Sequence, residues 1–337
     1  MKSLIRQILL LTWLGAFIYS LVSVAEYWEY DIKAPDVEKM LTTRVNADVL
    51  KKSLEEAIAA EEYDEARSLI VLGQHYNHAL NYPAYLRLIN EKDTASSRLV
   101  KQVSGFAGGF FSGKAETASG VAGALTSDFT VIGDLRDLSE QYSLYQQGLP
   151  VNELVATLAG VGVCLTAATI GSLGVAAPVK AGTSTLKLAT KMNRLTRSFR
   201  GELTRVGGRV FNLDGFLKRI DGADLSSVSR IAKESYKPAA ARQIGVIAEQ
   251  ASGVVKNTSM VDSIHLLKYV DNAQDLSRLS RVSQRFGVHT RGVFRLLGKA
   301  AVRGVKALRI TLELLISLIG ALFSAMLFVA SIGGGRK

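Results

Sequence analysis

Three long stretches of this chain carry no charged residue, at 8–25, 154–179 and 314–333. As helices rising about 1.5 Å per residue, stretches of this length can cross a bilayer. Elsewhere apolar residues recur three and four positions apart, and no period-two alternation persists. The pattern predicts an all-α membrane protein with N- and C-terminal transmembrane helices, a Gly/Ala-rich central helical hairpin and a basic helical domain.

The N-terminal stretch, 1–25, fits either a signal anchor or a signal peptide. Lys2 and Arg6 precede its apolar run, and Ser-Val-Ala at 23–25 is an acceptable cleavage site after Ala25. We favour the anchor, because the aromatic residues that follow are typical of a membrane interface. They include Trp28 and Tyr30. The segment 310–333 is the strongest transmembrane prediction, since positive charges precede and follow its apolar run.

The external region 26–103 is predicted to consist of short helices. Leu50, Leu54 and Ile58 share one apolar face, and Leu69 and Ile70 lie on a second face beyond a kink near 61–63. The phrase AIAAEEYDEARSLI resembles one helix pair of a tetratricopeptide-like repeat, but no second copy follows. An ordinary αα-hairpin is therefore the preferred interpretation.

The apolar hairpin is predicted over 104–179, with 128–150 as an amphipathic connector. Small residues four positions apart would let two helices approach closely; they are Gly105, Gly109, Gly113, Ala156, Gly160, Ala167 and Gly171. Lys114 and Glu116 would each cost about 2.5–3.5 kcal/mol at the lipid-facing centre of a spanning helix. We expect a packed hairpin, re-entrant or sunk at the membrane interface among other helices. Two true spans and a buried soluble pair are the alternatives.

The topology depends on that hairpin. If only the two terminal segments cross the membrane, the basic domain lies on the same external side as 26–103. If 154–179 also crosses alone, the basic domain returns to the cytoplasm, a placement that the positive-inside tendency favours. The sequence favours the cytoplasmic placement slightly.

Charge is distributed very unevenly. The chain has a net charge of +11, yet 180–309 contains 25 Lys and Arg against 9 Asp and Glu. Leu188, Met192, Leu195, Phe199 and Leu203 follow the apolar face of one helix. Its other face carries basic residues that suit anionic lipid headgroups; these are Lys187, Lys191, Arg194 and Arg197. Nucleic acid is an unlikely partner, because aromatic residues are sparse there and no binding motif is present.

Catalytic chemistry is weakly indicated. Asp128, Asp134 and Asp137 form an acidic group beside the apolar hairpin, where they could cap a helix or form a polar site. No catalytic, cofactor-binding or metal-ligating residues are assigned, and no cofactor is expected. The single cysteine, Cys164, lies in an apolar run, where an inert thiol is expected.

The phrases TSDFTVIGDLRDLSEQ and NELVATLAGVGVCLTAATIGSLGVAAPVKAGTSTLK resemble a family of bacterial helical membrane proteins with no assigned activity. The resemblance covers about 50–300 and implies a helical, membrane-associated architecture without site residues. SDFTVIGDLRD is also similar to the pre-toxin segment that precedes secreted toxin domains, although basic helices follow it here.

These features predict a non-enzymatic, membrane-anchored scaffold or assembly component of the bacterial inner membrane. Its expected partners are membrane lipids and other membrane or envelope proteins, including copies of itself. The runner-up is a pore-forming or membrane-perturbing protein, and binding of nucleic acid by the basic region is a third reading.

Overall fold

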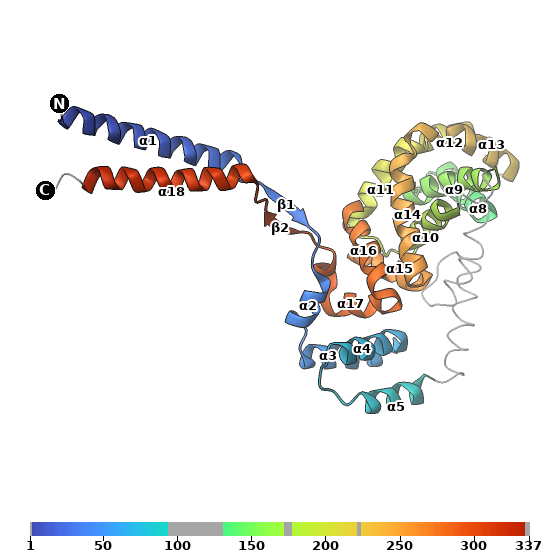
Figure 1. Cartoon of the computed structure of the whole chain (residues 1–337). Coiled ribbons are helices and arrows are strands. Elements are labelled where there is room, and N and C mark those ends of the chain that lie inside the picture. Colours follow the sequence, from blue (N-terminus) through green and yellow to red (C-terminus); the bar gives the residue numbers. More distant parts are fainter. Residues whose placement is uncertain (1, 94–130, 172–176, 221–223, 334–337) are drawn as a thin grey trace. The chain divides into compact units, whose positions relative to one another are not determined.

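The computed structural model describes residues 2–93, 131–171, 177–220 and 224–333 (Figure 1). The chain divides into two compact units, which are described separately. Unit 1 contains Met1–Ala34 and Gly304–Lys337, and unit 2 contains Pro35–Arg303. Apart from one short pair of strands and an isolated bridge, the secondary structure of the described residues is helical, as the sequence predicts.

Unit 1 is an antiparallel helical hairpin closed by a short ladder. Helices α1 (Lys2–Glu26) and α18 (Leu312–Gly333) lie side by side, with the start of α1 beside the end of α18 (Figure 1). Strands β1 (Tyr30–Lys33) and β2 (Val305–Leu308) pair antiparallel beyond them. Sequence periodicity did not predict the ladder, because four residues are too few to establish an alternation.

The two helices of unit 1 meet along a seam of small residues. Ser317, Ala321 and Ser324 of α18 are buried, whereas Leu322 is 72% exposed and Ile316 is 60% exposed. A Cβ added at Gly320 would lie 3.2 Å from Oγ of Ser20 on α1. Large apolar side chains therefore point outward and small ones inward, the reverse of a helix pair in water.

Both helices of unit 1 are long and apolar enough to cross a membrane. The spans are Gln7–Glu26 and Leu312–Ile332. The ring of Trp13 on α1 packs edge-on against that of Phe323 on α18, with centroids 6.4 Å apart.

Unit 2 is a helical bundle. Its elements, in chain order, are α2 (Val37–Arg44), α3 (Ala47–Ala59), α4 (Tyr63–His75), α5 (Tyr82–Lys92), α8 (Val131–Gln146), α9 (Glu153–Gly171), α10 (Ala177–Lys191), α11 (Arg197–Val210), α12 (Leu213–Arg219), α13 (Leu225–Ser235), η1 (Pro238–Ala240), α14 (Arg242–Asn257), α15 (Met260–Leu266), η2 (Leu267–Tyr269), α16 (Ala273–Phe286), η3 (Gly287–His289), α17 (Thr290–Leu297) and η4 (Gly298–Ala301).

Short polar side chains mark where many of these helices begin. Each accepts a hydrogen bond from a backbone N–H of the first turn, which satisfies a group that the helix itself leaves unpaired. The capping residues are Asp36, Asn46, Asn81, Thr196, Asn212, Asp224, Ser259 and Asn272.

Helix α9 occupies the interior of unit 2. Leu154, Leu158 and Val161 are buried, and α9 contacts α8, α10, α11 and α13. Over the part whose side chains are described, 153–165, α9 is therefore a core helix enclosed by other helices. This agrees with the buried alternative for this part of 154–179, and the membrane hairpin stays a prediction. The other predicted arm, before residue 131, lies outside the described residues.

The acidic N-terminal helices and the basic C-terminal helices belong to the same unit. Helix α17 contacts α2, α3 and α4. Because 35–93 and 180–303 pack together, they must lie on the same side of any membrane. The slight preference for a cytoplasmic basic domain opposite an external N-terminal region is therefore wrong.

The single helix predicted around 187–203 is divided in two. α10 ends at Lys191, Asn193 adopts a left-handed φ of 53°, and Thr196 caps α11 through a hydrogen bond from Phe199 N. Asparagine tolerates this conformation better than most residues. The apolar periodicity continues through the break because both helices face the same core.

Two helical glycines provide a matched test of the packing. A Cβ at Gly182 on α10 would lie 1.7 Å from the carbonyl oxygen of Ala248 on α14, whereas a Cβ at exposed Gly201 on α11 meets nothing within 4 Å. We expect Gly182→Ala to lower the free energy of unfolding by about 1–3 kcal/mol. Gly201→Ala should raise it by about 0.5–1 kcal/mol. Chemical denaturation monitored by circular dichroism measures both, and equal effects would contradict the close approach of α10 to α14.

Candidate functional site: a buried aspartate–lysine network

Helix α8 places two acidic side chains inside unit 2. Asp134 and Asp137 lie three residues apart, so they project from the same side of the helix. Both are almost fully buried, although each carries a carboxylate. A buried carboxylate needs partners of opposite charge, because leaving water costs it several kcal/mol.

Helix α10 provides these partners. Lys180, Lys187 and Lys191 are separated by seven and four residues, which places them on one face. Nζ of Lys187 lies 2.6 Å from Oδ1 of Asp134 and 2.8 Å from Oδ2 of Asp137. Nζ of Lys191 lies 2.7 Å from Oδ1 of Asp137, and Lys180 pairs with Oδ2 of Asp134. We call these five residues the aspartate–lysine network.

A glycine on α9 makes room for the network. A Cβ at Gly162 would lie 2.3 Å from Oδ2 of Asp134, so any larger residue would displace the carboxylate. The carbonyl oxygen of Gly162 also accepts a hydrogen bond from Nζ of Lys180 at 3.4 Å. The network therefore links α8, α9 and α10.

Burial and ion pairing act against each other on the carboxyl groups. At Asp137, burial disfavours the charged form, but Lys187 and Lys191 together outweigh it and lower its pKa below the usual value. At Asp134, burial is the larger effect and raises the pKa despite Lys187 and Lys180. The two carboxyl groups thus differ in pKa, although Lys187 bridges both.

The chemistry open to the network is limited by its enclosure. The side chains of Lys180 and Lys191 are 8% exposed, and those of Lys187 and both aspartates are at most 1% exposed. A substrate could not contact these groups without separation of the helices. The arrangement instead fixes the packing of α8 against α10, since a misplaced helix would leave buried charges unpaired.

The structure assigns different roles to the residues expected at an anionic membrane surface. Lys187 and Lys191 face the aspartates of α8 instead of lipid, which contradicts that expectation for both. Arg194 is half-buried beyond the end of α10, and Arg197 is exposed at the start of α11. The lysines on this face of α10 pair with the aspartates of α8, which covers the face.

The small residues predicted to pack a membrane hairpin divide into three groups. Gly105, Gly109 and Gly113 lie outside the described residues, as does Asp128. Ala156 is buried in unit 2, and a Cβ at Gly160 would lie 2.3 Å from the ring of Phe211, which follows α11. Ala167 and Gly171 belong to α9, in a part whose side chains are not described.

A second ionic cluster joins the two ends of unit 2. Arg291 of α17 pairs with Glu62, with Glu65 through Nε at 2.7 Å, and with Asp262 at 3.4 Å. Arg295 Nη2 lies 2.9 Å from Oε2 of Glu56. The N-terminal acidic helices thus neutralise part of the positive charge of the second half.

His265 lies near this cluster, and its imidazole stays neutral over an unusually wide range of pH. Burial, together with Arg291 and Arg194, lowers its pKa to about 4. The thiol of Cys164 is also un-ionised at neutral pH, since burial raises its pKa to about 11. The expectation of an unreactive thiol agrees with this surrounding.

Sequence reasoning identified Asp134 and Asp137 as a polar site but missed Lys180 and Gly162. Lys180 was placed at the boundary between an apolar segment and a basic domain, although its spacing to Lys187 and Lys191 indicates one helix face. Nothing in the sequence pattern distinguishes Gly162 from the neighbouring glycine, because only the position of Asp134 makes it necessary.

Comparison with protein-family models, with curated proteins and with solved structures finds no match to this chain. The fold and the network define a class without reference to relatives: a helical domain with a buried aspartate–lysine network, joined to an apolar helical hairpin. The resemblance to bacterial membrane proteins stays a prediction.

The network's contribution to stability can be measured with a surface control. Asp137→Asn leaves Lys187 and Lys191 buried beside a neutral amide, and we expect it to lower the free energy of unfolding by about 3–5 kcal/mol. Asp214→Asn breaks an exposed pair with Lys218 and should cost less than about 1 kcal/mol. Urea unfolding of the full chain in detergent measures both, and a cost below 1 kcal/mol for Asp137→Asn would contradict the account.

Proposed function

We propose that this protein is a non-enzymatic, membrane-anchored scaffold or assembly component of a bacterial envelope. The observation that carries the proposal is the inverted polarity of unit 1. Exposed Leu315, Ile319 and Leu322 contrast with buried Ser317 and Ser324 on the same helix. An apolar surface of this extent is unfavourable in water, and lipid is the solvent that suits it.

Pairing of α18 with α1 supports a retained anchor over a cleaved signal peptide. Loss of 1–25 would remove α1 and expose the small, hydroxyl-bearing side of α18 to lipid. In an antiparallel hairpin, both ends of the chain face one side of the membrane. Lys2 and Arg6 precede the apolar run of α1, whereas Glu26 and Glu29 follow it, so the positive-inside tendency favours a position of unit 2 outside the cytoplasm.

The enclosure of the aspartate–lysine network supports a non-enzymatic role. Its ionisable groups pair with one another and are closed to solvent. A helical domain tethered to a membrane provides surfaces for partner proteins, and this is what a scaffold requires. The proposed partners are envelope proteins and membrane lipids.

The runner-up function, a pore, has weaker support. Its proposed hairpin included 154–179, and the described part of α9 is enclosed by other helices of unit 2. A pore would then need α1 and α18 from several copies. Dye release from anionic liposomes tests this function directly, and loss of release on Gly320→Leu would assign it to the α1–α18 seam.

The scaffold proposal is tested by separating the domain from its anchor. A variant with Leu315, Ile319 and Leu322 replaced by Asn makes the outer face of α18 polar, while the seam stays intact. We expect the full chain to be extracted only with detergent and to sediment as a complex larger than a monomer. The variant should retain that complex but move it to the soluble fraction.

Three results would contradict the proposal. The full chain could sediment as a monomer after cross-linking in intact cells. It could release dye from liposomes, which would favour the pore. It could also turn over a substrate in a reaction lost in Asp137→Asn but not in Asp214→Asn, which would make the network catalytic.

A further inference from the structure

A groove runs along one face of α14 in unit 2. It has a volume of about 430 Å³, within the range of ligand sites. Gln243, Val246, Ile247 and Gln250 belong to α14 at spacings of three, four and seven residues, which is one helix face. The full lining is Ala240, Arg242, Gln243, Val246, Ile247, Gln250 and Ala273.

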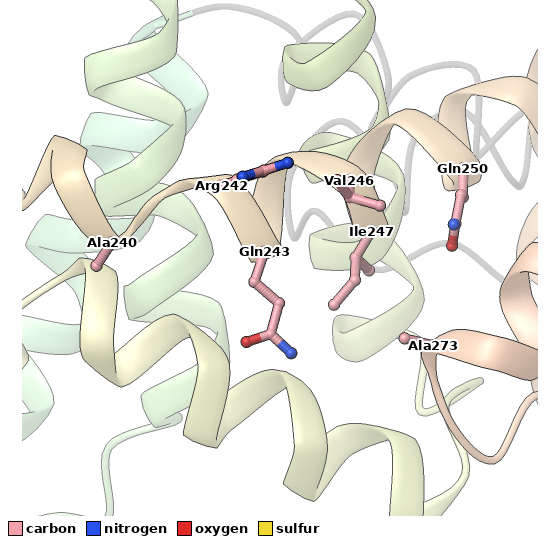
Figure 2. Close-up of a pocket in the computed structure, with 7 residues that line it drawn as sticks. All are labelled: Ala240, Arg242, Gln243, Val246, Ile247, Gln250 and Ala273. Carbon is pink, nitrogen blue, oxygen red and sulfur yellow. The ribbon is translucent and has the colours of Figure 1, made fainter.

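The side chains of the groove converge on a common space. Figure 2 shows Gln243, Ile247 and Gln250 pointing from α14 into it, between Ala240 at one end and Ala273 at the other. Val246 is 47% exposed, so an apolar surface remains accessible. The groove thus combines an apolar floor with a primary amide near each end.

One of these amides lacks a partner. Oε1 of Gln250 is shielded from solvent and accepts no hydrogen bond from any residue that the structure describes. A buried acceptor left unpaired costs about 1–3 kcal/mol, so a ligand that brings an N–H group would recover that cost once the Gln250 side chain rotates toward it. An acyl chain brings no such donor.

The spacing of the amides suits a polypeptide main chain. Gln243 and Gln250 are seven residues apart on a helix, or about 10 Å along its axis. An extended chain rises about 3.3 Å per residue, so three residues span that distance. Extended segments present free N–H and C=O groups, whereas a helix uses its own internally and would leave Gln250 unpaired.

The charges at the two ends of the groove differ, and this difference would orient a bound ligand. At the Ala240 end, Arg242 is exposed. Lys237 and Arg209 are also exposed, and Lys237 N donates a hydrogen bond at 2.7 Å to the carbonyl oxygen of Val210, the residue after Arg209. No described acidic residue forms a salt bridge with any of the three cations. At the Ala273 end, Oε2 of Glu202 accepts a hydrogen bond from Ala273 N at 3.0 Å. The positive charge at the Ala240 end therefore favours a ligand that carries a carboxylate there.

We propose that this groove binds an extended, acidic-apolar segment of a partner polypeptide. The main chain of that segment pairs with Gln243 and Gln250, an aliphatic side chain covers Val246, and an acidic residue pairs with Arg242. The inference rests on the proposed scaffold function and names the chemistry of one partner.

The test uses the purified full chain in lipid nanodiscs. A displayed library of random dodecapeptides is selected on this protein, with counter-selection on the Val246→Asp variant. We expect the enriched peptides to carry Asp or Glu within four positions of an aliphatic residue. A fluorescein-labelled copy of the most enriched peptide is then titrated by fluorescence anisotropy.

Matched variants separate the groove from general surface effects. Arg242→Glu and Gln250→Leu should each weaken binding at least tenfold. Arg87→Glu reverses an exposed arginine of α5, and Val71→Asp alters a 42% exposed valine of α4; both should change binding less than twofold. N-methylation of the peptide backbone in the central three residues should also weaken binding at least tenfold.

Several results would overturn the inference. They are an absence of peptides that distinguish the wild type from Val246→Asp, enrichment of basic peptides, and tighter binding by a helix-stapled version of the same peptide. The readout is the affinity of the purified chain for a peptide. If the groove binds no such peptide, the membrane complex expected of a scaffold is still observed. Failure of the scaffold proposal would remove that complex without changing peptide affinity.

Discussion

The apolar outer surface of α1 and α18 is the constraint on which the rest of this account depends. Two antiparallel helices present leucine, isoleucine and phenylalanine outward and meet through serine, alanine and glycine. In water the hydrophobic effect would favour the opposite arrangement. The β1–β2 ladder closes the hairpin, and Arg309 N donates to the carbonyl oxygen of Glu29 at 2.8 Å beside it. If both helices cross a membrane, everything between them lies on one side of it.

Inside unit 2, acidic and basic side chains of different helices pair with one another. The excess of positive charge in the second half does not by itself require an external anion. Asp134 and Asp137 neutralise lysines of α10, and acidic residues of α3 and α4 neutralise arginines of α17. The basic residues around the groove on α14 differ because no described acid pairs with them. That difference separates charge that stabilises the bundle from charge that is available to a partner.

Features set by local sequence were predictable. The length of the terminal apolar stretches predicted two helices capable of spanning a membrane, and spacing predicted the apolar faces of α3 and α4. Spacing also indicated that Asp134 and Asp137 could form a polar site. The place of 154–179 was not predictable, since a charge-free helix suits a lipid interior and a protein core equally. For 154–165, the surrounding helices α8, α10 and α11 form the environment that the structure describes. Periodicity likewise identified a polar face for Lys187 and Lys191 but not the aspartates opposite it.

The most direct test of the account is the side of the membrane on which each region lies. In a Cys164→Ser background, single cysteines at Lys51 and Lys256 probe the two ends of unit 2, and a cysteine at Lys2 probes the other side. A membrane-impermeant maleimide added to spheroplasts should label the cysteines at 51 and 256 equally, and the one at 2 only after permeabilisation. Opposite labelling of 51 and 256, or labelling of position 2 in intact spheroplasts, would contradict the account.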